Sequence, residues 1–242
     1  MTLMTYEEYF AKDPNLRDPD PCLEFTPYPL PSLTSRIIGL HSAISVHGYT
    51  FIDGRQVWYE SILERCCALL GRLRPDVTQV AEQPPAVTYI DDDGVEQRHT
   101  FDFRFTVERA GRILTAVKPS ALVEKTGIDR IVELTAEQIS PSVADFVDLF
   151  TEEKLSEVDL FNAETVNLAT RDPWPEDDAV LAKTLPKLKG EITIGDLVDK
   201  SGLGGFGYDA VVRAVDARVL RLVEYQKLEF DAVVARTAKR KD

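Results

Sequence analysis

Two segments decide the fold expected for this chain: HTFDFRFTV over residues 99–107 and ILTAVK over residues 113–118. In the first, an aromatic or apolar side chain takes every second position from Phe101, and polar side chains, including Asp102, take the others. That alternation has the period of a β-strand with one buried face. The second segment predicts a neighbouring strand that carries Lys118 at its end and stops at Pro119. If the two strands pair, Asp102 and Lys118 converge at one end of a sheet.

An acid and a lysine in this arrangement suit the hydrolysis of a phosphodiester. A carboxylate on a strand is a rigid ligand for a hard cation such as Mg²⁺, and a lysine beside it stabilises charge that develops at phosphorus. A further acid is expected from the preceding helix, where Glu60 and Glu64 share one face at a spacing of four residues. The same residues also fit ordinary roles: a solvated acid on a polar strand face, an edge lysine and a solvent-facing helix.

Length and composition bound the remaining choices. With 242 residues the chain has room for one large domain or two small ones. Three cysteines cannot form a disulfide framework, and the adjacent Cys66 and Cys67 fit the core of a helix in a reducing compartment. No membrane span is expected, because no run of eighteen apolar residues occurs. No secretory signal is expected at the acidic N-terminus. These features predict a cytoplasmic protein.

Charge is distributed unevenly along the chain. The net charge is −13, which disfavours indiscriminate binding to nucleic acids. Residues 200–242 hold nine basic and six acidic residues, so this end carries +3 and the first 199 residues carry −16. An acidic body with a mildly basic end fits a protein that is held on DNA partly by partner proteins.

The pattern of apolar residues and breakers divides the chain into four parts. Residues 1–35 are rich in Pro and Asp and predict an irregular N-terminal arm. Residues 36–170 predict an α/β domain with two short strands before residue 53, a helix at 56–73, a strand at 86–90, a turn at 91–94 and the two deciding strands. Its last part, 121–170, is expected to be helical with short breaks and to include a helix at 143–150. Residues 171–177 predict a linker, and residues 178–242 a second, smaller domain.

The second domain shows the order of elements of a winged helix. A short helix starts near Thr193, its expected N-cap, and the glycine-rich residues 201–207 form a turn. A helix at 208–219 and strand-like runs at 220–225 and 230–235 follow. Three arginines, Arg213, Arg218 and Arg221, lie on or just after the second helix. They fit contacts to DNA phosphates and equally fit a solvated helix face.

Taken together, these segments resemble the TnsA-like endonuclease subunit of heteromeric transposases, a PD-(D/E)xK nuclease. The resemblance covers about residues 35–170, and it rests on an ordered set of short motifs rather than on one specific motif. The motifs are YESILE at 59–64, VAEQP at 80–84, DG at 93–94, TFDF at 100–103 and VKP at 117–119. The end of the chain from residue 178 is similar to the winged-helix-like C-terminal domain of that family.

The resemblance implies a restriction-endonuclease-like mixed sheet flanked by helices, and a metal-dependent endonuclease that cuts one DNA strand at each transposon end. It implies Mg²⁺, with Mn²⁺ as a substitute, and three partners: double-stranded DNA, a DDE-type transposase subunit and an AAA+ ATPase regulator. By motif, Glu64, Asp102 and Lys118 would be the catalytic residues, and Glu60 is the second choice for the helix acid. Glu64, Asp102 and the backbone carbonyl of Val117 would hold the metal.

Two positions depart from the family pattern. Phe101 stands where a proline often precedes the aspartate, and Ala116 stands two residues before the lysine, where the family has Gln or Glu. Two other functions stay open, and the first is favoured by Ala116, because alanine cannot ligate a cation. One is a nuclease-inactive protein that binds DNA or acts as a scaffold in a transposition complex. The other is a stand-alone restriction-type nuclease.

Overall fold

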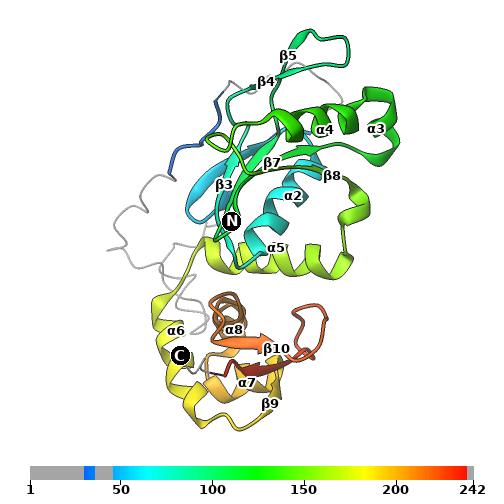
Figure 1. Cartoon of the computed structure of the whole chain (residues 1–242). Helices are drawn as coiled ribbons and strands as arrows, with labels where there is room; N and C mark the ends of the chain where they lie inside the picture. The colour runs from blue at the N-terminus through cyan, green and yellow to red at the C-terminus, as the bar shows by residue number, and fades with distance from the viewer. Residues whose placement is uncertain (1–29, 36–45, 239–242) are drawn as a thin grey trace, which may run out of the picture.

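The computed structural model of the chain describes residues 30–35 and 46–238 (Figure 1). The predicted arm at 1–35 therefore lies mostly outside the described residues, as do the two strands expected around 37–38 and 43–46, apart from Val46. Within the described residues, no helix is both long and apolar enough to cross a membrane.

The described elements fall into an upper and a lower group in Figure 1. The upper group comprises β1 (Gly48–Ile52), β2 (Arg55–Tyr59), α2 (Ile62–Leu73), β3 (Val77–Glu82), β4 (Val87–Ile90), β5 (Glu96–His99), β6 (Phe103–Val107), β7 (Gly111–Val117), α3 (Ser120–Thr126), α4 (Ile128–Gln138), β8 (Phe146–Phe150), η1 (Glu152–Lys154) and α5 (Glu157–Arg171). The lower group comprises α6 (Pro175–Thr184), η2 (Leu185–Lys187), β9 (Glu191–Thr193), α7 (Ile194–Ser201), η3 (Gly204–Phe206), α8 (Gly207–Asp216), β10 (Leu220–Leu222) and β11 (Val233–Arg236).

A mixed four-stranded sheet with the order β3-β6-β7-β8 forms the centre of the upper group. β3, β6 and β7 pair antiparallel, and β7 pairs parallel with β8. Residues of α2 and α5 pack with Phe103, Phe105 and Val107 on one face. Ile128 of α4 packs with Leu114 and other residues on the opposite face. The predicted class, α/β with a mixed sheet flanked by helices, is confirmed.

Two predicted helical stretches are strands. Residues 146–150 form β8 rather than part of a helix, and residues 56–59 belong to β2, so the helix predicted at 56–73 begins only at Ile62. Both are short apolar runs, for which periodicity alone does not distinguish a strand from a buried helix turn. Pairing with β7 decides the conformation of β8, because the FVDLF segment completes the edge of the sheet.

Helix α2 lies unusually close to the sheet at one glycine. A Cβ atom on Gly71 would stand 2.1 Å from the ring of Phe105 on β6. Only glycine permits this approach, which lets the buried face of α2, with Cys67, Ala68 and Leu69, pack directly on the aromatic strand. The position of the N-terminus of α2 relative to β6 and β7 is fixed by this packing.

The lower group forms its own core around the three-stranded antiparallel sheet β10-β11-β9. Its order of helix, tight turn, helix and two strands is the predicted one. Thr193 is the N-cap of α7, as expected, because its hydroxyl accepts the N–H of Asp196 at 3.1 Å. The predicted linker is shorter than expected, since α5 continues to Arg171 and α6 starts at Pro175.

Helix α5 belongs to the cores of both groups. Ala163 packs with the upper core, whereas Val166 and Ala169 pack with the lower one. The guanidinium of Arg72 on α2 also makes two hydrogen bonds to the carboxylate of Asp216 on α8, at 3.1 and 2.8 Å. These contacts join the two groups across a packed interface.

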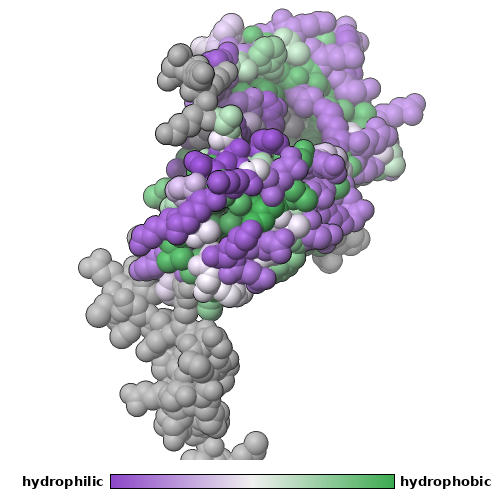
Figure 2. All heavy atoms as spheres, turned by 90° about the horizontal axis from the view of Figure 1, so that it is seen from below, coloured by the Kyte–Doolittle hydropathy of each residue, from purple (hydrophilic) through white to green (hydrophobic). Residues whose placement is uncertain are grey.

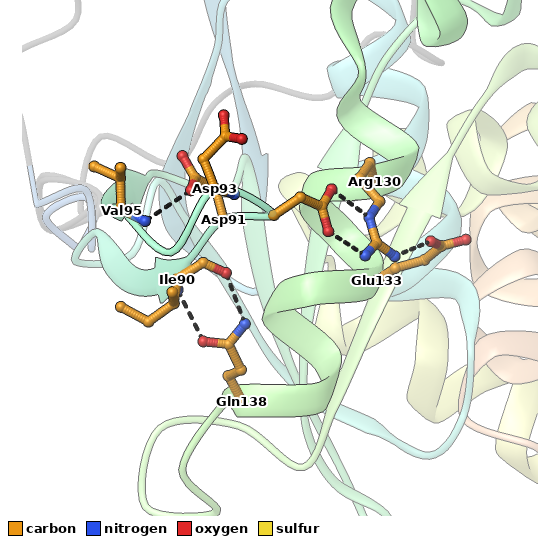
Figure 3. Close-up of polar contacts among 8 residues, drawn as sticks. Ile90, Asp91, Asp93, Val95, Arg130, Glu133 and Gln138 are labelled. Atoms are coloured by element: carbon orange, nitrogen blue, oxygen red, sulfur yellow. Dashed lines mark hydrogen bonds and ion pairs between the residues drawn. The ribbon is translucent and has the colours of Figure 1, made fainter.

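The hairpin of β4 and β5 projects from the sheet and is fastened to α4. The Gln138 side chain accepts the N–H of Ile90 at 2.8 Å and donates to its carbonyl at 2.9 Å, as Figure 3 shows. Arg130 forms an ion pair with Asp92 at the hairpin turn and another with Glu133. The hairpin therefore has a fixed orientation relative to the helix.

We expect Gln138→Ala to release the hairpin without unfolding the sheet. The change removes two hydrogen bonds to one residue, which together contribute about 1–3 kcal/mol locally. Amide hydrogen exchange at Ile90 should accelerate, while exchange in β6 stays unchanged. The matched control is the neighbouring exposed residue in Glu137→Ala. Equal exchange at Ile90 in both variants would show that Gln138 does not hold the hairpin.

The surface seen from below is mainly hydrophilic, with a hydrophobic patch among the charged and polar residues (Figure 2). Most buried apolar side chains of the described residues gather in three cores, although several large ones, such as Phe146, Tyr225 and Phe230, are exposed. Among the described charged residues only Glu64, Glu82 and Asp177 are buried, so solvent and counterions screen most of the charge.

Candidate active site

Asp102 lies where the regular pairing of β6 and β7 ends. The last ladder pair is Phe103 with Thr115. Beyond it, the Asp102 N–H donates to the Thr115 carbonyl at 3.1 Å, and its Oδ2 accepts the N–H of Val117 at 2.7 Å. The Asp102 carbonyl accepts the N–H of Gln83 at 2.7 Å. The backbone of Asp102 is therefore fixed between the ends of β3 and β7, and its carboxylate is oriented by the Val117 N–H.

The prediction of one uninterrupted strand over residues 99–107 is wrong. Residues 100–102 are outside any strand, between β5 and β6. The break changes the face on which the aromatic residues pack: Phe101 lies in the core beneath α4, while Phe103 lies in the core beneath α2. Sequence alternation alone could not reveal this, because both residues are almost fully buried.

Glu64 stands at the N-terminus of α2 in a capping arrangement. The Ser61 hydroxyl accepts the Glu64 N–H at 3.1 Å and donates to Glu64 Oε1 at 2.9 Å. Glu64 Oε2 accepts the N–H of Glu60 at 2.7 Å. This reciprocal pattern satisfies donors at the start of a helix. Capping is thus one role of Glu64, and each of its oxygens keeps a second lone pair.

The two acids share one electrostatic environment. Burial, followed by the Glu64 charge, raises the pKa of Asp102 to about 7, against the opposing effects of the Val117 N–H and Lys118. Burial also raises the pKa of Glu64, against the lowering by the Glu60 N–H and the Ser61 hydroxyl. The charge of Lys118 acts on both acids. The structure therefore places Glu64, Asp102 and Lys118 within electrostatic range of one another.

Ala116 and Val117 lie on opposite faces of β7. Ala116 is 1% exposed and packs with Phe101 and Leu114, and Val117 packs in the core beneath α2. The place that an acid would take two residues before Lys118 is therefore filled by apolar contacts. A longer polar side chain there would have to be buried in a packed core, which is costly.

Three further residues belong to this site. Glu60 raises the pKa of both acids through its charge, so it lies near the pair as well as on the helix start. His99 is close to Lys118, because burial and then the lysine charge lower the pKa of its imidazole. The sequence pattern alone did not mark His99 as part of this site.

Gln83 is the third of these residues, and its backbone is strained. Its φ is +41°, in a region that L-residues rarely adopt. Its side chain is buried. Such strain costs on the order of 1–3 kcal/mol and is found preferentially at functional sites. Here the conformation directs the Gln83 N–H to the Asp102 carbonyl and its own carbonyl to the N–H of Ser35. The strained residue thus helps to fix Asp102.

The site can supply two carboxylates to a cation. Across the described residues, no group of three or more His, Cys, Asp and Glu side chains is arranged to hold a metal ion. Mg²⁺, however, is often held by one or two carboxylates and keeps several waters. Burial and mutual repulsion disfavour the ionised form of two partly buried acids, which is why their pKa values are raised. A bound cation would stabilise the ionised carboxylates. The residues present fit such an ion.

The arginines predicted to contact DNA differ in availability. Arg213 is only 10% exposed, and it binds the carboxylate of Asp178 and the carbonyl of Ala169. It therefore contributes to the packing of α8 on α5 and α6. Arg218 and Arg221 are exposed and line a common pocket beside α2 and α5. Their contact with DNA stays a prediction.

Comparison with known proteins identifies no relative: no family model matches the chain, and no curated protein matches it.

Proposed function

We propose that the chain is a metal-dependent DNA endonuclease of the PD-(D/E)xK type, similar to the TnsA-like subunits of heteromeric transposases. The observation that carries the proposal is the convergence of Glu64, Asp102 and Lys118, with the pKa of Asp102 raised to about 7. Strained and perturbed residues meet there at the end of a mixed sheet. Such clusters are more frequent at functional sites than elsewhere.

Each residue has a role in this proposal. Asp102 and Glu64 would hold a divalent cation, and the carbonyl of Val117 is a further candidate ligand. When bound, the cation would supply Lewis-acid polarisation of the scissile phosphate. The ammonium of Lys118 would stabilise the negative charge that develops at phosphorus. The clamped backbone of Asp102 holds its carboxylate in one orientation, which lowers the reorganisation needed for catalysis.

The restriction-endonuclease-like fold and the winged-helix domain are part of the same proposal. The sheet order β3-β6-β7-β8 with helices on both faces supports the first. The succession of α7, α8, β10 and β11 supports the second. We further propose double-stranded DNA, a DDE-type transposase and an AAA+ ATPase as partners. The basic balance of residues 200–242 favours an association of this end with DNA or with such partners.

A nuclease-inactive DNA-binding or scaffold protein is the second candidate. The observation that favours it is the packing of Ala116 in the core, together with the capping role of Glu64. In that case Glu64 and Asp102 would stabilise the helix start and the strand ends without binding a metal.

Calorimetric titration with Mn²⁺ in the presence of a short DNA duplex separates the two candidates. The nuclease proposal expects saturable binding by the wild type and loss of at least about 100-fold in affinity for Asp102→Asn, because one of two charged ligands is gone. Asp129→Asn, which changes an exposed acid on α4, is the matched control and should bind normally. Strand cleavage in Mg²⁺ is then assayed with the same proteins. Absence of Mn²⁺ binding by the wild type would reject the nuclease.

A further inference from the structure

A second pocket lies between the β4–β5 hairpin, the sheet and the segment after α4. Its volume is about 540 Å³. Two arginines, Arg98 and Arg104, line it together with Gln138, Ser140 and Ser142, and its described lining contains no acidic residue. In a chain with a net charge of −13, this concentration of positive charge is unusual.

Arg104 is held inside the pocket by the central strand β6. It pairs with Ala81 on β3 and with Leu114 on β7, so its backbone is fixed on both sides. Its Nε is buried and has no hydrogen-bond partner in the part of the chain that the structure describes. Among the described residues, no carboxylate forms an ion pair with it, whereas Arg72 pairs with Asp53 and Asp216, and Arg213 pairs with Asp178. A buried charged donor without a partner is costly, and a ligand would remove that cost.

Arg98 and the two serines face the same space from other elements. Arg98 is on β5, in the hairpin that Gln138 and Arg130 fasten to α4 (Figure 3), so its strand is fixed relative to the pocket. The hydroxyls of Ser140 and Ser142 bond to each other at 2.8 Å. Either hydroxyl can rotate to donate to a ligand.

We propose that this pocket binds a phosphate group through Arg98 and Arg104. Guanidinium groups match the geometry of phosphate oxygens. Two such groups with nearby hydroxyls offer more donors than the two oxygens of a carboxylate can accept, while the oxygens of a phosphate can use them. The pocket is open to solvent on one side, so a phosphate attached to a larger molecule can enter.

The position of Arg104 in the sequence favours a nucleic-acid backbone as the source of the phosphate. Arg104 follows Asp102 by two residues, although Asp102 itself lies just before β6. The pocket therefore adjoins the segment that carries the candidate active site, and a nucleic-acid strand bound at that site carries further phosphates on either side. This choice of source rests on the proposed function, whereas the phosphate site itself does not.

Two titrations test the proposal on the full chain. In the first, inorganic phosphate is added and the Nε–H resonance of Arg104 is followed by NMR, with chloride at equal ionic strength as the reference. In the second, a labelled DNA duplex is titrated. Both are repeated with Arg104→Gln, with Arg98→Gln and with the control Arg171→Gln, which removes an exposed arginine that pairs with Asp172. Circular dichroism checks that each variant is folded.

The expected result is a saturable shift of the Arg104 Nε–H resonance with phosphate but not with chloride. Affinity for phosphate should fall at least about tenfold in both pocket variants, since each removes charge-assisted hydrogen bonds, and stay unchanged in Arg171→Gln. Parallel weakening of duplex binding identifies a nucleic-acid backbone as the source; unchanged duplex binding identifies a free phosphate compound.

A resonance that does not move with phosphate, or pocket variants that bind phosphate as the wild type does, would overturn the proposal. Should Arg104→Gln not fold, Arg98→Gln decides alone, because Arg98 is exposed and is not needed for the core. Mn²⁺ binding by the same variants tests the catalytic proposal separately. Loss of phosphate binding with normal Mn²⁺ binding shows that the two sites are distinct.

Discussion

At pH 8 and in the presence of EDTA, we expect Asp102→Asn to melt at a higher temperature than the wild type. The pKa of Asp102 rises from an ordinary value of 3.8 to about 7 in the folded protein. Below pH 4 the folded and unfolded chains both carry the proton, and ionisation costs nothing. As the pH rises from 4 to 7 the unfolded chain ionises first, so the wild type loses stability. The loss is complete above pH 7.

The size of this effect is large for a single side chain. A shift of three pKa units corresponds to at most about 4 kcal/mol. Asparagine keeps an oxygen that can accept the Val117 N–H, and it carries no charge to be buried or repelled by Glu64. The difference in melting temperature between variant and wild type should therefore grow from pH 5 to pH 8 and vanish near pH 4.

Thermal unfolding monitored by circular dichroism across this pH range provides the measurement. Asp129→Asn, at an exposed position on α4, should show no such pH-dependent gain. Adding Mn²⁺ at pH 8 should raise the melting temperature of the wild type and leave Asp102→Asn unchanged, because a ligand stabilises only the form that binds it. A variant that is less stable than the wild type at pH 8 would show that Asp102 bears no buried charge.

This combination distinguishes a functional acid from a structural one. When a carboxylate that stabilises the fold is neutralised, the free energy of unfolding falls, because its hydrogen bonds or its ion pair are weakened. Asp102 has a single bond from the Val117 N–H, and its nearest charged neighbours include two acids and one lysine. Such an arrangement is costly without a cation, and enzymes tolerate this kind of cost at their active sites.

The central strands and the site could be predicted because local signals agreed with each other. β6 and β7 follow from alternation of apolar residues and from Pro119, and α7 follows from its cap at Thr193. The meeting of Asp102 and Lys118 required only that these two strands pair. Glu64 was a candidate because helical periodicity indicated a helix there and Glu64 shares a face with Glu60, although the start of α2 at Ile62, with Ser61 as its N-cap, was not predicted.

The remaining features depend on tertiary contacts that no local pattern contains. β8 is a strand because β7 offers it a parallel partner. The positive φ of Gln83 depends on the contacts of its N–H and carbonyl with residues far along the chain. The partners of Arg213 lie on two other helices. The sequence alone therefore could not distinguish an arginine in a buried ion pair from an arginine exposed to solvent.

The junction between the two groups leads to the second large effect, which concerns Asn162 on α5. We expect Asn162→Ala to destabilise the protein by about 2–5 kcal/mol. The Asn162 side chain accepts the N–H of Leu228 at 2.7 Å and donates to the carbonyl of Gln226 at 3.0 Å. Its removal leaves the Leu228 N–H, next to a side chain that is 2% exposed, without its partner. An unsatisfied buried polar group costs about 1–3 kcal/mol, and the lost bonds add to this cost.

Asn167→Ala is the matched control on the same helix, because its side chain makes one longer bond, of 3.3 Å, to the Thr50 hydroxyl. Urea unfolding should show a clear loss for Asn162→Ala and less than half of it for Asn167→Ala. Hydrogen exchange should accelerate first in β10 and β11, since the segment between them is what Asn162 holds. If exchange instead accelerates equally in β6, both groups unfold as one unit, and the division expected near residues 171–177 has no energetic meaning.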